Sequence, residues 1–352
     1  MPQKRRASPV TRSRRSNERP EFALPSAVPA LLPRTLSPQL ATLVKKPPPG
    51  AAWIFEAKLD GYRILSRIEN GKARLLTRNG NDWTAKMPAL ADEVASVGIE
   101  SGWLDGEIVV MNDAGVPNFN ALQNAMDASK GASVSYFVFD LPYANGYDLT
   151  RSPLHARRSL LRGLMGKHNG ERVKFSDDFP GDGETLLKAA CKMGLEGIIA
   201  KRNDSAYVST RSTSWLKIKC SQRQEFVVIG FVDRTNSNKS EVGSVLLGYY
   251  AGDALHYAGS CGTGWDMRTA ADLHKRLAKI EIDHPALDKD EMRPGRWSKR
   301  KPGNERWVKP KLVIEVEFTE WTPDGHVRHP SFQGIRTDKP AESVTRERPR
   351  DP

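Results

Sequence analysis

Short runs of apolar residues separated by turns dominate the middle of the sequence. Between residues 36 and 220, seven runs have the length and alternation of β-strands, and four longer segments have helical spacing. The expected strands are Ala52–Ala57, Tyr62–Ile68, Lys72–Thr77, Gly106–Met111, Ser135–Asp140, Gly197–Lys201 and Ser214–Lys219, and the expected helices are Met87–Val97, Asn118–Met126, Pro153–Leu164 and Gly183–Met193. Strands and helices that do not alternate regularly favour an α+β domain with antiparallel sheets.

The pattern changes after Cys220. The strands expected beyond it are Glu225–Val232, Ser244–Tyr250, Leu255–Gly259 and Leu312–Thr319, with one helix at Thr269–Lys279 and a charged connector at Asp288–Gly303. Several strands with a single helix are typical of a small β-barrel of the OB type. The polar residues 221–224 predict a hinge, so the domains are expected at 36–220 and 221–340.

The two ends of the chain are expected to be disordered tails, at 1–35 and 341–352. The segment from Lys4 to Arg19 carries seven basic residues and one glutamate, and it cannot bury enough apolar surface to fold alone. It could bind phosphates nonspecifically or only increase solubility.

Composition narrows the class of protein. The 352 residues carry a net charge of +12 with a pI near 9.6, which favours a polyanionic partner over a merely solvated basic surface. No apolar run approaches the ~20 residues of a membrane-spanning helix, and no secretory signal is expected at the start of the sequence. The three cysteines, Cys191, Cys220 and Cys261, suggest neither a disulfide framework nor a metal site, so a reducing cytosol is expected.

Lys58 has the clearest chemical interpretation. It follows an apolar strand and precedes Asp60-Gly61. A lysine with its ordinary pKa of ~10.4 is protonated and inert at neutral pH, and it becomes a nucleophile when it is desolvated or close to other cations. Lys217 and Lys219 lie on one face of an expected strand and could bind phosphate, although an exposed amphipathic strand would show the same spacing.

Two acidic side chains also share a strand face. Asp105 and Glu107 are separated by one residue and are followed by the apolar run 108–110. Buried carboxylates need a cation or hydrogen bonds, so contacts to a metal or a ribose are plausible, against the alternative of a solvated acidic face.

Six segments in a fixed order resemble the motifs of the covalent nucleotidyltransferase superfamily, which includes ATP-dependent DNA ligases, RNA ligases and capping enzymes. They are Lys58–Arg63, Thr77–Gly80, Asp105–Val109, Tyr136–Asp140, Glu196–Lys201 and Ser214–Lys219. The resemblance implies a nucleotidyltransferase (ATP-grasp-like ligase core) or adenylation domain over 36–220, followed by an OB-fold β-barrel domain.

The resemblance implies a role for each matched residue. Lys58 would attack the α-phosphate of ATP and form a phosphoramidate with AMP. Glu56 would read the adenine amino group, and Phe139 would stack on the adenine. Arg63 and Arg78 would hold phosphate and ribose; Glu107 and Glu196 would lie near Mg²⁺ or Mn²⁺ and the ribose; Lys201, Lys217 and Lys219 would contact the α-phosphate.

The C-terminal third of the sequence resembles the OB domain of ATP-dependent DNA ligases, in the form found in bacterial end-joining ligases. The matching segments are Trp307–Pro310, Val313–Phe318, Trp321–Gly325 and Arg328–Lys339. In this family basic residues of the last segment meet the departing pyrophosphate. Arg328, Arg336 and Lys339 match, and Arg336 is preferred.

The resemblance also implies partners and a location. Nicked duplex DNA or broken DNA ends are the expected substrate, with a DNA-end-binding helper protein as a further partner. The polymerase and phosphoesterase modules often fused to such ligases are not found, so a minimal, monomeric enzyme is expected. It would work in the bacterial cytoplasm at the nucleoid, without a membrane.

Two alternatives stay open at this point. An RNA ligase or capping enzyme would use the same lysine and the same phosphate contacts, so the motifs do not separate it from a DNA ligase. A nucleic-acid-binding relative that has lost catalysis is the other alternative, although every chemical position of the motifs is filled.

Overall fold

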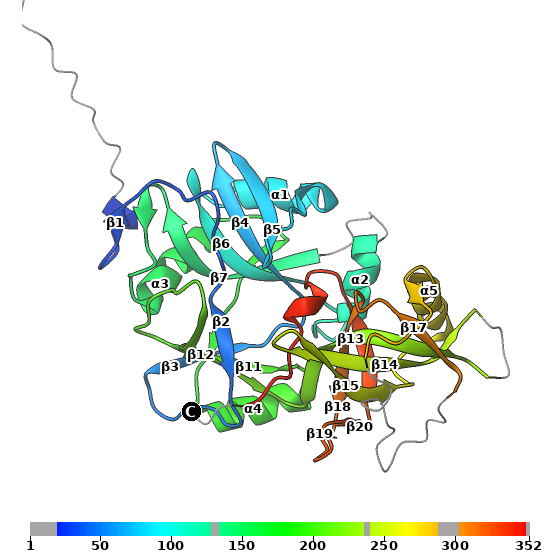
Figure 1. The fold of residues 1–352 in the computed structure, drawn as a ribbon. Helices are drawn as coiled ribbons and strands as arrows, with labels where there is room; N and C mark the ends of the chain where they lie inside the picture. Colours follow the sequence, from blue (N-terminus) through cyan, green and yellow to red (C-terminus); the bar gives the residue numbers. More distant parts are fainter. Residues whose placement is uncertain (1–19, 128–133, 236–239, 288–302, 350–352) are drawn as a thin grey trace, which may run out of the picture.

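The computed structural model describes residues 20–127, 134–235, 240–287 and 303–349. The chain folds into an N-terminal α+β domain with two β-sheets and a C-terminal domain built on a third sheet, packed side by side (Figure 1). Every strand and helix expected from the hydrophobic pattern overlaps an element of the structure. The predicted fold class is therefore confirmed.

The larger sheet of the N-terminal domain is largely antiparallel and has the order β1-β8-β7-β6-β4-β5, with β9 parallel to β7. Its strands are β1 Val28–Pro29, β4 Tyr62–Glu69, β5 Lys72–Thr77, β6 Ser101–Val110, β7 Val134–Ala144, β8 Tyr147–Asp148 and β9 Val173–Phe175. Apolar side chains of β4, β5 and β6 pack against helix α1, Pro88–Ala95, to form the main core.

The smaller sheet has the order β10-β3-β11-β12-β2. Its strands are β2 Leu40–Leu43, β3 Trp53–Ala57, β10 Asp178–Phe179, β11 Gly197–Arg202 and β12 Arg211–Lys219. Helix α4, Gly183–Lys192, packs on β11 and begins at Asp182, whose side chain accepts hydrogen bonds from the first turn. A small apolar cluster around Phe139 and Trp215 joins the two sheets.

Two further helices complete the N-terminal domain. Helix α3, Leu154–Met165, lies on β7 and β9, and helix α2, Phe119–Asp127, contacts β6 and the C-terminal strand β21. Helix α2 therefore packs on the larger sheet and also contacts the C-terminal domain.

The C-terminal domain is an OB-type sheet organised around the long strand β13. Strand β14 pairs with one edge of β13, and β18 and β17 pair in turn with its other edge. The elements are β13 Gln222–Asp233, β14 Val242–Ala251, β15 Ala254–Cys261, α5 Met267–Ala278, β16 Glu281–Ile282, β17 Glu305–Val308, β18 Val313–Phe318, β19 Glu320–Trp321, β20 Val327–Arg328 and β21 Ser331–Arg336. A hinge is expected at residues 221–224, but 222–224 already belong to β13, so only residue 221 of that stretch lies outside a strand.

Both expected tails are partly folded, which corrects the sequence analysis. Phe22 is fully buried in the main core, and Val28–Pro29 pairs with β8. At the other end, Ala341–Ser343 forms a short 3-10 helix and Val344 is fully buried. A few apolar residues within polar segments form these contacts, so average composition did not reveal them. The basic stretch before residue 20 lies outside the described residues.

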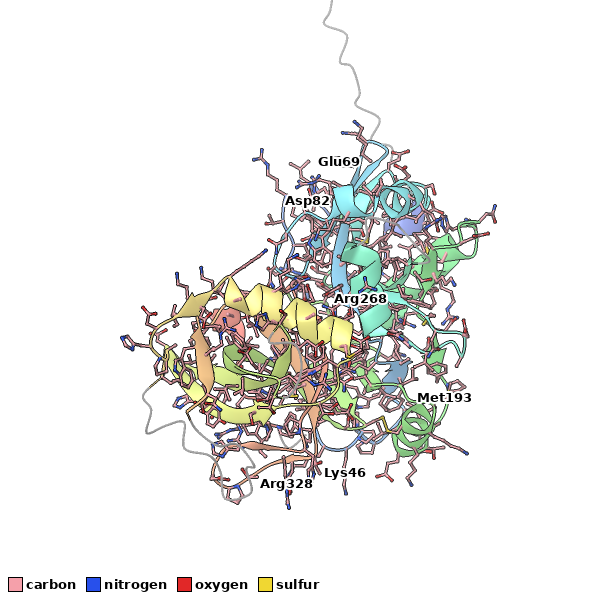
Figure 2. All side chains as sticks on the ribbon, turned by 90° about the vertical axis from the view of Figure 1, so that its right-hand side faces the viewer. Lys46, Glu69, Asp82, Met193, Arg268 and Arg328 are labelled. Atoms are coloured by element: carbon pink, nitrogen blue, oxygen red, sulfur yellow. A yellow bond between two sulfur atoms is a disulfide. The ribbon has the colours of Figure 1, made fainter. Side chains whose placement is uncertain are left out.

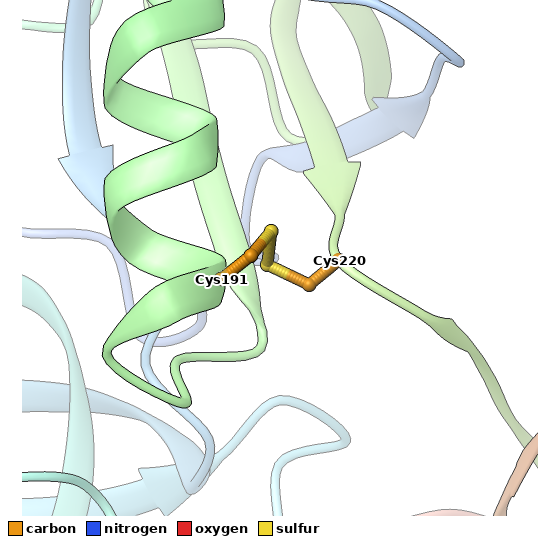
Figure 3. Close-up of a disulfide and its surroundings, with 2 residues drawn as sticks. All are labelled: Cys191 and Cys220. Carbon is orange, nitrogen blue, oxygen red and sulfur yellow. A yellow bond between two sulfur atoms is a disulfide. The ribbon is translucent and has the colours of Figure 1, made fainter.

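A disulfide joins Cys191 to Cys220, contrary to the expectation from the sequence (Figure 3). Cys191 lies in the last turn of α4, and Cys220 follows β12 directly. Since α4 packs on β11 and β12 is paired with β11, the two cysteines meet although 29 residues separate them. Counting an odd number of cysteines could not reveal this proximity. Cys261 is buried with a free thiol.

No helix in the described ranges is both long enough and apolar enough to cross a membrane.

Gly61 is required by a close approach between two segments. A Cβ atom at this position would lie 2.0 Å from the carbonyl oxygen of Ile108 and 2.8 Å from Val109. We expect Gly61→Ala to lower the free energy of unfolding by ~1–3 kcal/mol, because β6 or the segment beside Lys58 has to move. Urea unfolding measures the loss, with Gly163→Ala in helix α3 as control, where a Cβ meets nothing within 4 Å. Equal stability of both variants would contradict this assignment.

Candidate active site

A cavity of about 210 Å³ lies between the two sheets of the N-terminal domain and is closed on one side by the OB-type domain. All eleven site residues expected from the sequence line it. They are Glu56, Lys58, Arg63, Arg78, Glu107, Phe139, Glu196, Lys201, Lys217, Lys219 and Arg336. The sheets bring together residues that are up to 280 positions apart in the chain.

Lys58 lies in the connection by which the chain crosses from one sheet to the other. Strand β3 of the smaller sheet ends at Ala57, and β4 of the larger sheet begins at Tyr62. The backbone amide of Lys58 donates to the carbonyl of Gly197, and its amine forms an ion pair with Glu196. The side chain is only 19% exposed, so the amine faces the cavity and not bulk solvent. Its nearest charged partner is a carboxylate, although four further lysines line the same cavity.

Lys217 and Lys219 project into the cavity from the same face of β12, as their spacing predicted. Both donate to the carboxylate of Glu347, over 2.6 Å from Lys217 and 3.1 Å from Lys219. Burial and the charge of Lys219 lower the pKa of Lys217 to about 8. Burial also opposes the charge of Lys219, but Glu347 and Glu196 outweigh it and raise the pKa of this lysine.

Glu56 is buried in the wall of the cavity, where several donors hold its carboxylate. Arg158 donates to Oε1 over 2.8 Å, Ser176 donates to Oε2 over 3.0 Å, and Lys201 forms an ion pair over 2.6 Å. Burial lowers the pKa of Lys201 to about 8, although Glu56 opposes the shift. The carboxylate is thus fixed in orientation, as a group that reads a nucleobase edge has to be.

Arg158 is a residue that the sequence analysis missed. It extends from α3 into the core, where it also donates to the carbonyls of Phe139 and Ser176 and to Asp178. One guanidinium therefore connects Glu56 to the backbone of Phe139, the two residues expected at the adenine. The sequence shows only an Arg-Arg pair in an amphipathic helix, and nothing local indicates that both arginines are buried.

Phe139 and Arg63 form a stacked pair at the larger sheet. The Arg63 guanidinium lies 4.5 Å from the centre of the Phe139 ring and is held by both carboxylate oxygens of Asp105 over 2.5 and 2.7 Å. Tyr207 donates to the same carboxylate over 2.7 Å. Asp105 is therefore the partner of Arg63, while Glu107, two residues further along β6, lines the cavity.

Glu107 and Glu196, the two carboxylates expected near a metal, have different environments. Burial raises the pKa of Glu107 to about 7. Burial acts in the same direction on Glu196, but Lys58 and Lys219 lower its pKa to about 2. In the described part of the chain, no three His, Cys, Asp or Glu side chains are grouped to hold a metal ion. Mg²⁺ is commonly held by one or two carboxylates together with water and substrate phosphates, and these two glutamates fit such a site.

The OB-type domain contributes Arg336 and Lys339 to the cavity but not Arg328. Arg336 is the last residue of β21. Its side chain lines the cavity and forms ion pairs with Asp338 and Glu315. Arg328 is 46% exposed, pairs with Glu320 over 2.7 Å, and lies at the periphery in Figure 2. Of the three basic residues expected from the last motif, only Arg328 lies away from the cavity.

Several contacts hold the domains together beside the cavity. Arg223 of β13 forms an ion pair with Asp60 over 2.9 Å. The side chain of Gln123 in α2 exchanges two hydrogen bonds with the backbone of Ile335 in β21. The OB-type domain is thus docked with its last strand over the site.

Comparisons with known proteins agree with this arrangement. Residues 36–219 match the family described as ATP dependent DNA ligase domain, and residues 238–339 match the ATP dependent DNA ligase C terminal region. The multifunctional non-homologous end joining protein LigD of Pseudomonas aeruginosa is 42% identical over 344 residues, which cover 94% of this chain and 40% of that protein.

Two mycobacterial DNA ligases are also similar to this chain. The non-homologous end joining DNA repair protein LigD of Mycobacterium tuberculosis is 38% identical over 84% of this chain and 37% of its own length. A solved mycobacterial DNA ligase D complexed with ATP and MES superimposes with a TM-score of 0.65 at 36% identity, over 89% of this chain and 98% of that one. The chain spans about two fifths of the length of the curated relatives, and it belongs to the family of ATP-dependent DNA ligases.

Proposed function

We propose that this chain seals nicks or aligned ends in DNA through a covalent lysine–AMP intermediate on Lys58. The observation that supports the proposal best is the position of this amine. It is ion-paired, mostly buried, and placed in one cavity with Lys217 and Lys219. An amine next to paired cations, with access to a nucleotide, is the arrangement that nucleotidyl transfer requires.

The reaction has three steps. In the first, the amine of Lys58 loses a proton and attacks the α-phosphorus of ATP; a P–N bond forms, the bond to the bridging oxygen breaks, and pyrophosphate leaves. In the second, AMP passes to the 5′-phosphate at the nick, and the lysine is released. In the third, the 3′-hydroxyl attacks that phosphate, AMP departs, and the strand is continuous.

Each of the side chains that line the cavity has its own part in the proposed reaction. Glu56 and Phe139 bind the adenine, and Arg63 and Arg78 bind ribose and phosphate. Lys217 and Lys219 stabilise negative charge on the α-phosphate, with Lys201 beside them, and Arg336 meets the pyrophosphate. Glu107 and Glu196 would hold Mg²⁺ or Mn²⁺, which supplies further neutralisation of phosphate charge when bound.

The setting of the reaction is also a proposal. The LigD relatives carry names that refer to non-homologous end joining, and this chain covers only part of their length. We propose that it acts in end joining or nick repair in the bacterial cytoplasm, as a monomer, with help from a DNA-end-binding protein. The basic net charge of the chain supports binding to DNA.

Lys58→Ala is expected to abolish the covalent intermediate. The wild-type protein should gain the mass of AMP after incubation with ATP and Mg²⁺, whereas the variant should gain nothing and seal no nick. Binding to nicked DNA should be retained, because the phosphate contacts of the other cations remain. Intact-mass spectrometry and gel shift measure these quantities, with the exposed Lys46→Ala as control. A wild-type protein without the adduct would refute the enzyme assignment.

The preferred substrate is expected to be a nick in duplex DNA with ATP as nucleotide. Parallel sealing assays with nicked DNA, nicked RNA duplex and triphosphate-ended RNA, each with ATP and with GTP, test this. Faster joining of RNA, or transfer of GMP to an RNA end, would favour the RNA ligase or capping alternative.

Arg158→Lys is expected to reduce selectivity for adenine. The lysine keeps the charge but cannot reach Glu56 and the carbonyl of Phe139 together, so the adenine contacts lose their support. Loss of one charge-assisted hydrogen bond corresponds to about tenfold in the KM for ATP. The KM should rise while kcat stays within about threefold, and discrimination against GTP should fall.

The matched control for this substitution is Arg162→Lys, one turn further along α3. Arg162 pairs with Asp177 and Asp178 but does not contact Glu56 or Phe139. Equal changes in the KM for ATP and for GTP in Arg158→Lys would show that the arginine supports only the fold.

A further inference from the structure

The C-terminal segment 341–349 leaves the OB-type domain and extends to the cavity between the two sheets. Its first part is built into the fold. Ala341 and Val344 are buried against Val227 and Val313, and the backbone amide of Tyr250 donates to the carbonyl of Val344 over 2.7 Å. In Figure 1 the red end of the chain crosses from this domain towards β12. The segment is thus a structured strap and not a loose end.

The strap delivers one carboxylate to the active site. The backbone amide of Glu347 donates to the side chain of Gln224 over 3.1 Å, which fixes the position of the residue from the OB side. Its side chain, 23% exposed, bridges the amines of Lys217 and Lys219. The contact joins residues 130 and 128 positions apart in the chain.

We propose that Glu347 is a positioning residue for the first step of the reaction, holding Lys217 and Lys219 in place for the α-phosphate. This inference rests on the proposed adenylation of Lys58 and adds a residue from outside the motifs that the sequence analysis identified.

The positioning role of Glu347 follows from the charges of the two lysines that it contacts. Two ammonium groups on one strand face repel each other, and more strongly in a buried site than in water. A carboxylate that accepts from both removes the repulsion and fixes their separation. Although burial opposes it, the charges of Lys219 and Lys217 lower the pKa of Glu347 to about 2, so the bridge is ionised at neutral pH.

The bridge leaves N–H donors of both lysines available to a nucleotide. A carboxylate that only blocked the phosphate site would not do so. Each ammonium has three N–H groups. Lys217 uses one on Glu347; Lys219 uses one on Glu347 and one on the carbonyl of Arg223. Both amines therefore keep at least one donor for a phosphate oxygen while the carboxylate stays in place.

The contact also depends on the position of the OB-type domain. Lys217 and Lys219 belong to the N-terminal domain, whereas the strap is anchored on β13 and β14. The bridge can exist only while the two domains are docked with β21 over the cavity. The first step, in which Arg336 meets pyrophosphate, uses this arrangement, and the sealing step on DNA requires the domain to move away.

The test separates the two steps with Glu347→Gln, which removes the charge and preserves the shape. Single-turnover formation of the AMP adduct is measured over a range of ATP concentrations. Sealing of a nick that already carries AMP on its 5′-phosphate is measured without ATP. We expect adduct formation to slow by about tenfold or more, and sealing of the adenylated nick to stay within about twofold of wild type.

Two further variants complete the experiment. Glu342→Gln makes the same charge change on an exposed residue of the same strap and should leave both steps unchanged. Glu347→Asp should restore part of the adduct rate, because it returns the carboxylate. Thermal unfolding of all variants checks that the strap is still folded.

Three outcomes would overturn the inference. Faster adduct formation or tighter ATP binding in Glu347→Gln would show that the carboxylate competes with phosphate. If Glu347→Gln slowed both steps equally, the residue would have only a structural role. If the rate of adduct formation did not change, Glu347 would have no role in the first step. A wild-type protein that forms no adduct would instead refute the proposed function.

Discussion

The pairing of buried charges around the cavity of the N-terminal domain determines the organisation of this protein. Cations from both sheets line one cavity, and each needs a carboxylate or a phosphate because a lone charge is costly to bury. Lys58 has Glu196, Arg63 has Asp105, and Lys201 has Glu56. Each of these pairs joins segments of one sheet that are distant in the sequence. Arg158 of α3 connects the two sheets, because it pairs with Glu56 and donates to the carbonyl of Phe139.

The same requirement explains why the OB-type domain docks over the cavity. It brings Arg336 and Lys339, and with them Glu225, Glu315 and Glu347, so both signs of charge are added to the site. Both lysines of β12 pair with Glu347 of the strap, and Lys219 also pairs with Glu196 of its own domain. A substrate with phosphate groups therefore enters a site whose cations are already fixed in position, which lowers the cost of organising them during the reaction.

The movement proposed for this domain would have to occur at a short connection. Only residues 220 and 221 separate β12 from β13, and the disulfide anchors Cys220 to α4 just before that point. The end of the N-terminal domain is thereby held directly before β13. The ion pair between Arg223 and Asp60 has side chains only 10% and 12% exposed, so it costs more to break than an exposed pair unless DNA phosphates replace the carboxylate.

The sequence by itself determined the order and type of the main elements, the family, and eleven residues that line one cavity. Apolar periodicity and motif spacing are local properties, and both were sufficient for Lys58 and for the lysine pair on β12. Tertiary structure alone decided the contacts of Arg158 and Glu347, the Cys191–Cys220 disulfide and the packing of both chain ends. The reason is physical: Glu56 and Arg158 are 102 residues apart and Lys217 and Glu347 are 130, so their contacts arise from how the sheets and the strap pack and leave no pattern in neighbouring residues.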